Sequence, residues 1–274
     1  MRKQLVAQAL CGIAILGLAT LYVYRLTLVP WTSVFAGILA GFVIVAVTVV
    51  SLLLRKHPGC PGNPWWLPAG FLGGVGISVA IAPANTAYLQ AAASLPEAVM
   101  SLFSSFPEET AKLLAVFALI AALVPIRRPI EAAVVGMAVG AGFTVAEVVN
   151  NSLIAASMDL QSDYFNGVGT MTALFVLGPF SHAVYTGLAA WGLGIFLCHT
   201  DQPLDWRLAH FAVWFLLATA LHGTFNASRV IPGIAGLIAM ITVTVVEWML
   251  LIWLYRRSRA IGRRDAAAQV SPGK

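Results

Sequence analysis

Charged residues are scarce in this sequence, since only 10% of its 274 residues are Asp, Glu, Lys or Arg. A soluble globular domain carries about 25% charged residues, whereas this chain is 59% hydrophobic and has a mean hydropathy of +0.87. So much apolar surface cannot be hidden from water. The scarcity of charge therefore excludes a soluble fold and predicts an all-α, polytopic membrane helix bundle that forms one integral membrane domain over residues 1–274.

Cysteine and the common hydrolase signatures are also rare or absent. Cys11, Cys60 and Cys198 form no CxxC pair, which excludes a disulfide framework and a zinc knuckle. The chain has no HExxH, no Gly-x-Ser-x-Gly, no presenilin-type aspartate pair and no rhomboid-like Gly-x-Ser before a distant histidine. These absences exclude a zincin helix and the serine or aspartic sites that those patterns mark.

Long hydrophobic segments are abundant, and eight of them approach the roughly 20 residues that a membrane span needs. They cover residues 5–24, 31–54, 65–82, 107–125, 130–157, 170–198, 208–229 and 232–255. The segment 84–105 is too polar for a span, although its apolar residues recur at helical spacing. We expect either an amphipathic helix on the outer membrane surface or an ordinary extracellular connection there.

Lysine and arginine lie mostly on one side of this eight-span topology. Of the 16 basic residues, only Arg25 and Arg229 fall on the opposite side, and Lys112 lies within a span. Basic loops stay in the cytoplasm, so both termini and the loop at residues 127–128 are expected inside, with residues 159–167 outside. The basic tail 256–274 is expected to attract anionic lipid headgroups rather than nucleic acid.

Six ionisable side chains lie inside or at the mouth of the hydrophobic segments. They are Glu108, Glu109, Lys112, Glu147, His182 and His222. An ionisable residue near the bilayer centre costs roughly 3 kcal/mol on insertion scales, so such residues are functional-site candidates by default. Four separate spans carry them, which favours a common use over isolated structural roles.

The first group begins at the outer mouth of a predicted span. Pro107 suits the first turn of a helix, and acidic residues there suit the positive end of the helix dipole. Glu108 and Lys112 are four residues apart and Glu109 and Lys112 three apart, so these side chains share a face. A helix cap with an interfacial salt bridge is the structural alternative for this motif.

The second group lies on the fifth predicted span, after a stretch rich in glycine that permits close helix packing. Glu147, Asn150 and Asn151 line one face of this span by their three- and four-residue spacing. An uncompensated glutamate does not face lipid, so Glu147 is expected to face the bundle. Its structural alternative is a hydrogen bond to a neighbouring helix.

The two histidines lie on the sixth and seventh predicted spans. Pro179 is expected to kink the sixth span, where His182 and Tyr185 share a face. His222 and Asn226 are one turn apart on the seventh span. A single membrane histidine is more often a helix–helix hydrogen bond than a ligand, but two histidines with three acids favour a site.

Depth in the membrane favours one shared site. At about 1.5 Å per residue, Glu147, His182 and His222 lie in the outer half or near the middle of the bilayer, and the glutamate pair at 108–109 lies at the outer mouth. Antiparallel helices reach this depth from opposite directions. Glu247, on the last span, lies near the cytoplasmic side, so we expect it to be structural or interfacial.

These residue types suit chemistry that activates water. One of Glu108 and Glu109 is expected to activate the water, while the other holds the proton of the pair or orients the neighbouring lysine. Glu147, His182 and His222 form either a catalytic zinc set with an open position or a site whose histidines hydrogen-bond an oxyanion. The expected supporting residues are Lys112, Asn226 and Asn151.

Together these motifs resemble the PrsW family of intramembrane proteases. The resemblance rests on Glu108-Glu109-x-x-Lys112, Phe143-x-x-x-Glu147, His182 and His222-x-x-x-Asn226, in this order on successive spans. It covers about residues 105–229, the expected protease core. The wider superfamily of CAAX-protease and bacteriocin-processing enzymes usually has Arg in place of Lys112 and His in place of Glu147. This difference leaves both a metal-dependent and a glutamate-only mechanism open.

The resemblance implies an intramembrane endopeptidase in a bacterial plasma membrane. Its substrate would be a membrane protein, for example an anti-sigma factor, cleaved near the outer face. Two other classes stay open. A proton- or ion-coupled transporter would use the same cluster as a relay, although transporters often show repeats that are absent here, and a non-catalytic scaffold would retain the pocket alone.

Overall fold

The computed structural model describes residues 2–28, 32–158, 165–177 and 181–270, and these ranges contain helices and no strand. The helices are α1 Arg2–Thr27, α2 Ser33–Leu54, α3 Trp66–Ala80, α4 Ala82–Ala91, α5 Glu97–Phe103, α6 Ser105–Ala122, α7 Pro129–Ser157, α8 Phe165–Leu177, α9 Ser181–Cys198, α10 Leu204–Ser228 and α11 Gly233–Val270. The predicted all-α membrane bundle is confirmed.

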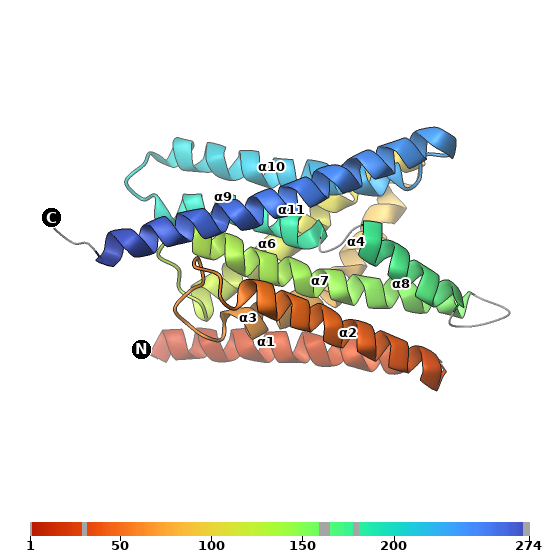
Figure 1. Ribbon diagram of the computed structural model, residues 1–274, viewed down its shortest axis with the longest axis horizontal. Coiled ribbons are helices and arrows are strands. Elements are labelled where there is room, and N and C mark those ends of the chain that lie inside the picture. The colour runs from red at the N-terminus through yellow and green to blue at the C-terminus, as the bar shows by residue number, and fades with distance from the viewer. Residues whose placement is uncertain (1, 29–31, 159–164, 178–180, 271–274) are drawn as a thin grey trace.

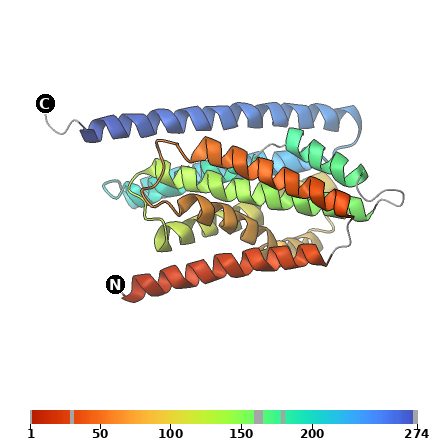
Figure 2. The same ribbon diagram turned by 60° about the horizontal axis from the view of Figure 1, so that its bottom comes forward.

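Helix α7 lies at the centre of the bundle, and α1 and α11 lie on opposite outer sides of it (Figures 1 and 2). Most residues of α7 and α9 are buried, whereas α1, α2 and α11 expose many large apolar side chains. Exposed apolar faces of this kind suit lipid contact. The start of α1 and the end of α11 lie at the same end of the bundle (Figure 1), as an even number of crossings requires.

Among the described residues, six helices are long and apolar enough to cross a membrane, namely α1, α2, α7, α9, α10 and α11. The pair α3 and α4, which is bent by 40° at a short break, would supply a seventh. Helix α6 has 18 residues but carries two glutamates and a lysine. Eight crossings with both termini in the cytoplasm therefore stay a prediction.

The predicted sixth span, residues 170–198, includes residues 178–180, which the structure does not describe. Its residues form two helices, α8, which ends at Leu177, and α9, which begins at Ser181. Pro179, the predicted cause of a kink, lies outside the described residues, as do residues 159–164 of the predicted outer loop and residues 271–274 of the basic tail.

The segment 84–105 forms most of two short helices, α4 and α5, rather than one amphipathic helix. They are tied together by Tyr88, whose hydroxyl donates a hydrogen bond to the carbonyl oxygen of Met100 at 2.7 Å. Helix α5 packs against α10, and α4 packs against α6. The segment therefore covers the end of the bundle where the ionisable residues of α6 lie.

Glycines on α7 allow two neighbouring helices to approach its backbone. A Cβ atom at Gly140 would lie 2.1 Å from the carbonyl oxygen of His182 on α9, and one at Gly142 would lie 2.0 Å from that of Phe71 on α3. Any larger side chain would push these helices apart. The predicted glycine-rich packing thus fixes the backbone of His182 against α7.

The loop between α2 and α3 docks on the later part of α11 through His57. The amide N–H of Gly59 donates to His57 Nδ1 at 3.0 Å, and therefore Nε2–H of a neutral ring donates to Ser258 Oγ at 2.8 Å. Burial, with the charge of Arg259 nearby, lowers the pKa of His57 to about 4. His57 is therefore a neutral structural residue here.

Candidate active site

The structure brings all six predicted ionisable residues together at the meeting point of four helices. Helix α6 contributes Glu108, Glu109 and Lys112, while Glu147 comes from α7, His182 from α9 and His222 from α10. Adjacent members lie within 3.7 Å of each other through the contacts described below. The fold therefore brings together residues that lie up to 114 positions apart in the sequence, as predicted.

Glu109 and Lys112 form the buried centre of this cluster. They make an ion pair, and neither side chain is exposed. His222 Nδ1 lies 2.8 Å from Glu109 Oε1, and Lys112 Nζ lies 2.8 Å from His182 Nδ1 and 4.4 Å from the ring centre of Phe143. A buried charge is strongly destabilising when it lacks a partner, and these contacts supply partners for both charges.

The contacts of His182 determine which ring nitrogen carries its proton. An ammonium group only donates, so His182 Nδ1 accepts from Lys112. In the neutral ring Nε2 then carries the hydrogen, which is donated to Glu147 Oε2 at 2.6 Å. His182 thereby links the buried ion pair of α6 to the glutamate of α7.

His222 has the opposite arrangement. A carboxylate only accepts, so Nδ1–H donates to Glu109 and the lone pair of a neutral ring lies on Nε2. That nitrogen lies 3.3 Å from the amide nitrogen of Asn226 and 3.7 Å from Glu108 Oε2. Asn226 also donates to Ser104 Oγ at 3.2 Å, which explains its predicted supporting role.

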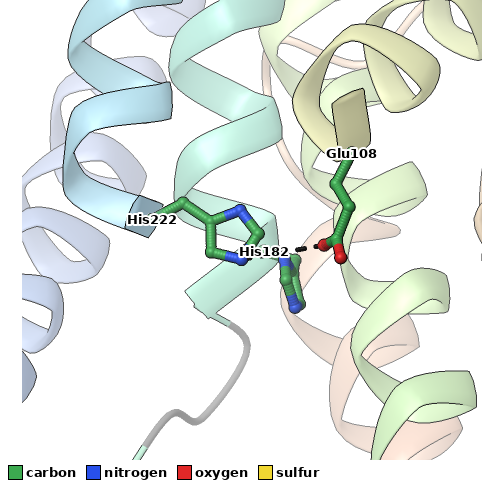
Figure 3. Close-up of side chains that lie close together, drawn as sticks. All are labelled: Glu108, His182 and His222. Carbon is green, nitrogen blue, oxygen red and sulfur yellow. Dashed lines mark ion pairs between the residues drawn. The ribbon is translucent and has the colours of Figure 1, made fainter. Parts of the chain in front are cut away.

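Three of these residues form a group that can hold a metal ion. One ligand atom each from Glu108, His182 and His222 lies within 4.8 Å of the others, and Figure 3 shows the carboxylate of Glu108 directed toward the two rings. Glu108 Oε2 is buried without a hydrogen-bond partner among the described residues. The buried Oε2 of Glu108 and the Nε2 lone pair of His222 suit a divalent metal. Nδ1 of His182 would become the third donor if the metal took the place of Lys112 as its partner.

The third member of this group differs from the predicted one. The sequence pointed to Glu147 as the ligand that accompanies the two histidines, but in the structure Glu147 is the hydrogen-bond partner of His182, and Glu108 lies with both rings. Spacing along a helix places these glutamates at similar depths. It does not show how far each helix is rotated toward the histidines.

Two cavities adjoin the cluster. The larger has a volume of about 590 Å³, and Glu108 and Glu147 line it together with Asn85, Asn150 and Asn151. The smaller, of about 20 Å³, is lined by Glu147 and both histidines of the cluster and has room for about one water molecule. Neither cavity reaches Glu109 or Lys112, so the five predicted catalytic residues do not all line one cavity.

Two further contacts of the cluster were not predicted. Asn85 of α4 donates to Glu108 Oε1 at 2.9 Å. The ring of Tyr185 stacks on His222, with ring centres 5.0 Å apart, and its hydroxyl donates to the buried Glu247 of α11. Glu247 is thus buried and joined to the cluster through Tyr185, rather than interfacial. In the sequence, only the polarity of the segment around Asn85 indicated that this residue could take part in the site.

Comparison with known protein families agrees with the motifs. A family model described as PrsW family intramembrane metalloprotease matches residues 62–254. The match includes every residue of the cluster and extends beyond the core expected at 105–229, from the loop before α3 into α11. No curated protein and no solved structure gives a significant match to the chain.

Proposed function

Since this multi-pass membrane protein belongs to the PrsW family of intramembrane proteases, we propose that its Glu/His cluster hydrolyses a peptide bond of a membrane-protein substrate. The observation that carries the proposal is the meeting of Glu108, Glu147, His182 and His222, of which the two glutamates line a cavity of about 590 Å³. Ionisable residues gathered beside a cavity large enough for a peptide segment suit hydrolysis.

The proposed setting is the outer face of a bacterial plasma membrane, with an anti-sigma factor as the example of a substrate. The distribution of basic residues supports this side, because Arg25, which is on the predicted outer side, lines the same cavity as Glu108 and Glu147. Lipid surrounds the bundle, and the arginines of α11 are proposed to contact anionic headgroups.

The metal that the family implies would be held by Glu108, His182 and His222, and zinc suits a set of one carboxylate and two imidazoles. When bound, such an ion supplies Lewis-acid polarisation of the scissile carbonyl and makes water more acidic. Glu109 keeps the Nε2 lone pair of His222 directed at the site, because it accepts a hydrogen bond from Nδ1–H.

Glu147 is the proposed general base. Its side chain is 36% exposed, it lines both cavities, and Oε2 already accepts a hydrogen bond from His182. Glu147 would take the proton of the attacking water and pass it to the leaving amine. Glu109 is fully buried and paired with Lys112, so its proposed role is to orient His222 rather than to touch water.

The test is cleavage of a panel of single-span reporter proteins by purified protein in lipid nanodiscs. Glu109→Gln, Glu147→Gln and His222→Ala are each expected to abolish cleavage, because each removes a contact of the cluster. Glu97→Gln, at an exposed glutamate of α5, is the matched control and is expected to cleave as the wild type does. Size-exclusion chromatography identifies variants that fail to fold, and Glu147 is the glutamate best placed to tolerate the change.

If all three variants still cleave the reporters, the protease proposal is wrong. Proton or ion flux through reconstituted protein would then favour the transporter alternative. A wild-type protein that neither cleaves nor transports would favour the scaffold.

A further inference from the structure

The large cavity extends from the Glu/His cluster to a helix outside the region that the family model matches. Its lining includes Tyr22 and Arg25 of α1, whereas the match begins at residue 62. A volume of about 590 Å³ lies within the roughly 300–1,000 Å³ typical of ligand sites. Helix α1 therefore forms a wall of the large cavity that Glu108 and Glu147 line.

The cavity offers hydrogen-bond partners to a peptide backbone. A polypeptide within a membrane needs an internal partner for each backbone N–H and C=O group, so unwinding it for cleavage costs several kcal/mol per unsatisfied group. The amides of Asn85, Asn150 and Asn151 line the cavity and can both donate and accept. Asn85 Oδ1 is buried without a hydrogen-bond partner in the described part of the chain, and it is an acceptor available to a bound peptide.

A contact between α1 and α7 sets the level of Arg25 relative to the catalytic groups. The hydroxyl of Tyr22 donates to the carbonyl oxygen of Ala146 at 2.9 Å, one residue before Glu147. Both helices run in the same direction along the bundle (Figure 1). Arg25 lies three residues beyond Tyr22, which corresponds to about 4.5 Å further toward the predicted outer face.

Arg25 is the cationic residue of the cavity lining, and its side chain is exposed. The two glutamates of the lining, Glu108 and Glu147, belong to the catalytic end. A guanidinium group binds a carboxylate through two parallel hydrogen bonds. An extended peptide advances about 3.3 Å per residue, so one to three residues separate the level of Glu147 from that of Arg25.

We infer that this cavity binds an unwound segment of a membrane-spanning polypeptide, and that Arg25 pairs with an acidic side chain of this segment about one to three residues from the scissile bond, on its outer side. The inference rests on the proposed protease function and adds a substrate class to it. The amides of α4 and α7 hold the unwound backbone, while Arg25 selects for the acidic residue.

The experiment uses single-span reporter peptides in nanodiscs that carry one Glu, Gln or Lys at successive positions outside the cleaved bond. Wild-type protein is expected to cleave the best Glu peptide with a kcat/KM roughly two- to fivefold above that of the matching Lys peptide, the range expected for an exposed ion pair. Arg25→Glu should make the Lys peptide the better substrate, and Arg25→Gln should remove the difference in kcat/KM between the two peptides. The change should lie mainly in KM, because the pair forms on substrate binding.

Arg55→Gln is the matched control, since Arg55 is also an exposed arginine at a helix end but lies outside the cavity. Arg55→Gln should leave the preference for the Glu peptide over the Lys peptide unchanged. Equal losses for the Glu, Gln and Lys peptides in Arg25→Glu would overturn the inference and leave Arg25 as a lipid anchor of α1. Failure of the wild type to cleave any peptide would instead count against the protease function, and photo-cross-linking of the Glu and Lys peptides would still measure selection at Arg25.

Discussion

Buried histidines occur in two regions of this protein, and their partners differ. His182 and His222 contact glutamates and a lysine at the junction of α6, α7, α9 and α10. His57 contacts a serine hydroxyl and a backbone amide in the loop that docks on α11, and the nearby charge is Arg259. The same side chain is therefore hydrogen-bonded to charged side chains in one region and to a hydroxyl and a backbone amide in the other.

The comparison teaches that partners, rather than burial, distinguish a candidate site from a structural contact. Both nitrogens of His57 dock the loop, since Nδ1 accepts from the amide of Gly59 and Nε2 contacts Ser258 of α11, and neither partner is a carboxylate. The Nε2 lone pair of His222 faces Glu108, because Glu109 accepts a hydrogen bond from Nδ1–H. Function is expected where fixed carboxylates direct an imidazole lone pair toward a cavity.

The largest expected effect comes from Lys112→Met, which removes the cation of the cluster. Glu109 would then be a buried charge without its ion-pair partner, which typically costs about 3–5 kcal/mol. Thermal unfolding in detergent should show this loss. The double variant Glu109→Gln, Lys112→Met removes both charges and should recover most of the stability. If it remained as unstable as the single variant, the ion pair would not be the cause.

A smaller but clear effect is expected from Gly140→Ala, which changes no charged group. The new Cβ atom would lie 2.1 Å from the carbonyl oxygen of His182, so α9 must move away from α7 at a cost of about 1–3 kcal/mol. Cleavage should fall with the loss of the His182–Glu147 contact. Gly41→Ala on α2, where a Cβ meets nothing within 4 Å, should unfold and cleave like the wild type.

The smallest effect concerns His57 and pH. Its pKa in the folded protein is about 4, below the ordinary value of 6.5, so the unfolded loop binds the proton more tightly. The stability that His57 contributes is complete above pH 6.5 and is lost as the pH falls toward 4. Hydrogen exchange at residues 55–62, corrected for intrinsic rates, should increase over this window. In His57→Gln the same pH change should have no such effect, and cleavage at pH 7 should be retained.

The sequence was sufficient to predict the residues of the cluster because ionisable side chains are costly in lipid. Glu147, His182 and His222 had to face the bundle, and their depths on antiparallel helices agreed. The ends of α1, α2, α7 and α10 and the start of α11 also lie within a few residues of the predicted spans, whereas α11 continues well beyond the predicted end of its span.

The sequence alone did not show how each helix is rotated about its own axis. Depth alone could not show that Glu108, rather than Glu147, lies with both histidines, because that depends on how α6 and α7 are turned. Glu247 was set aside because its depth differs, but the length of the Tyr185 side chain bridges that difference. The bend of 40° between α3 and α4 is likewise a feature that hydropathy does not record.

The most direct test of the central claim, that Glu108 and two histidines form a metal-dependent hydrolytic site, is metal content measured beside cleavage in the same preparations. Wild-type protein is expected to retain about one zinc ion per chain and to lose cleavage with a chelator. Glu108→Gln should lose both metal and cleavage, whereas Glu147→Gln should lose cleavage but keep most of its metal. Wild-type protein that cleaves without stoichiometric metal and resists chelators would contradict the claim.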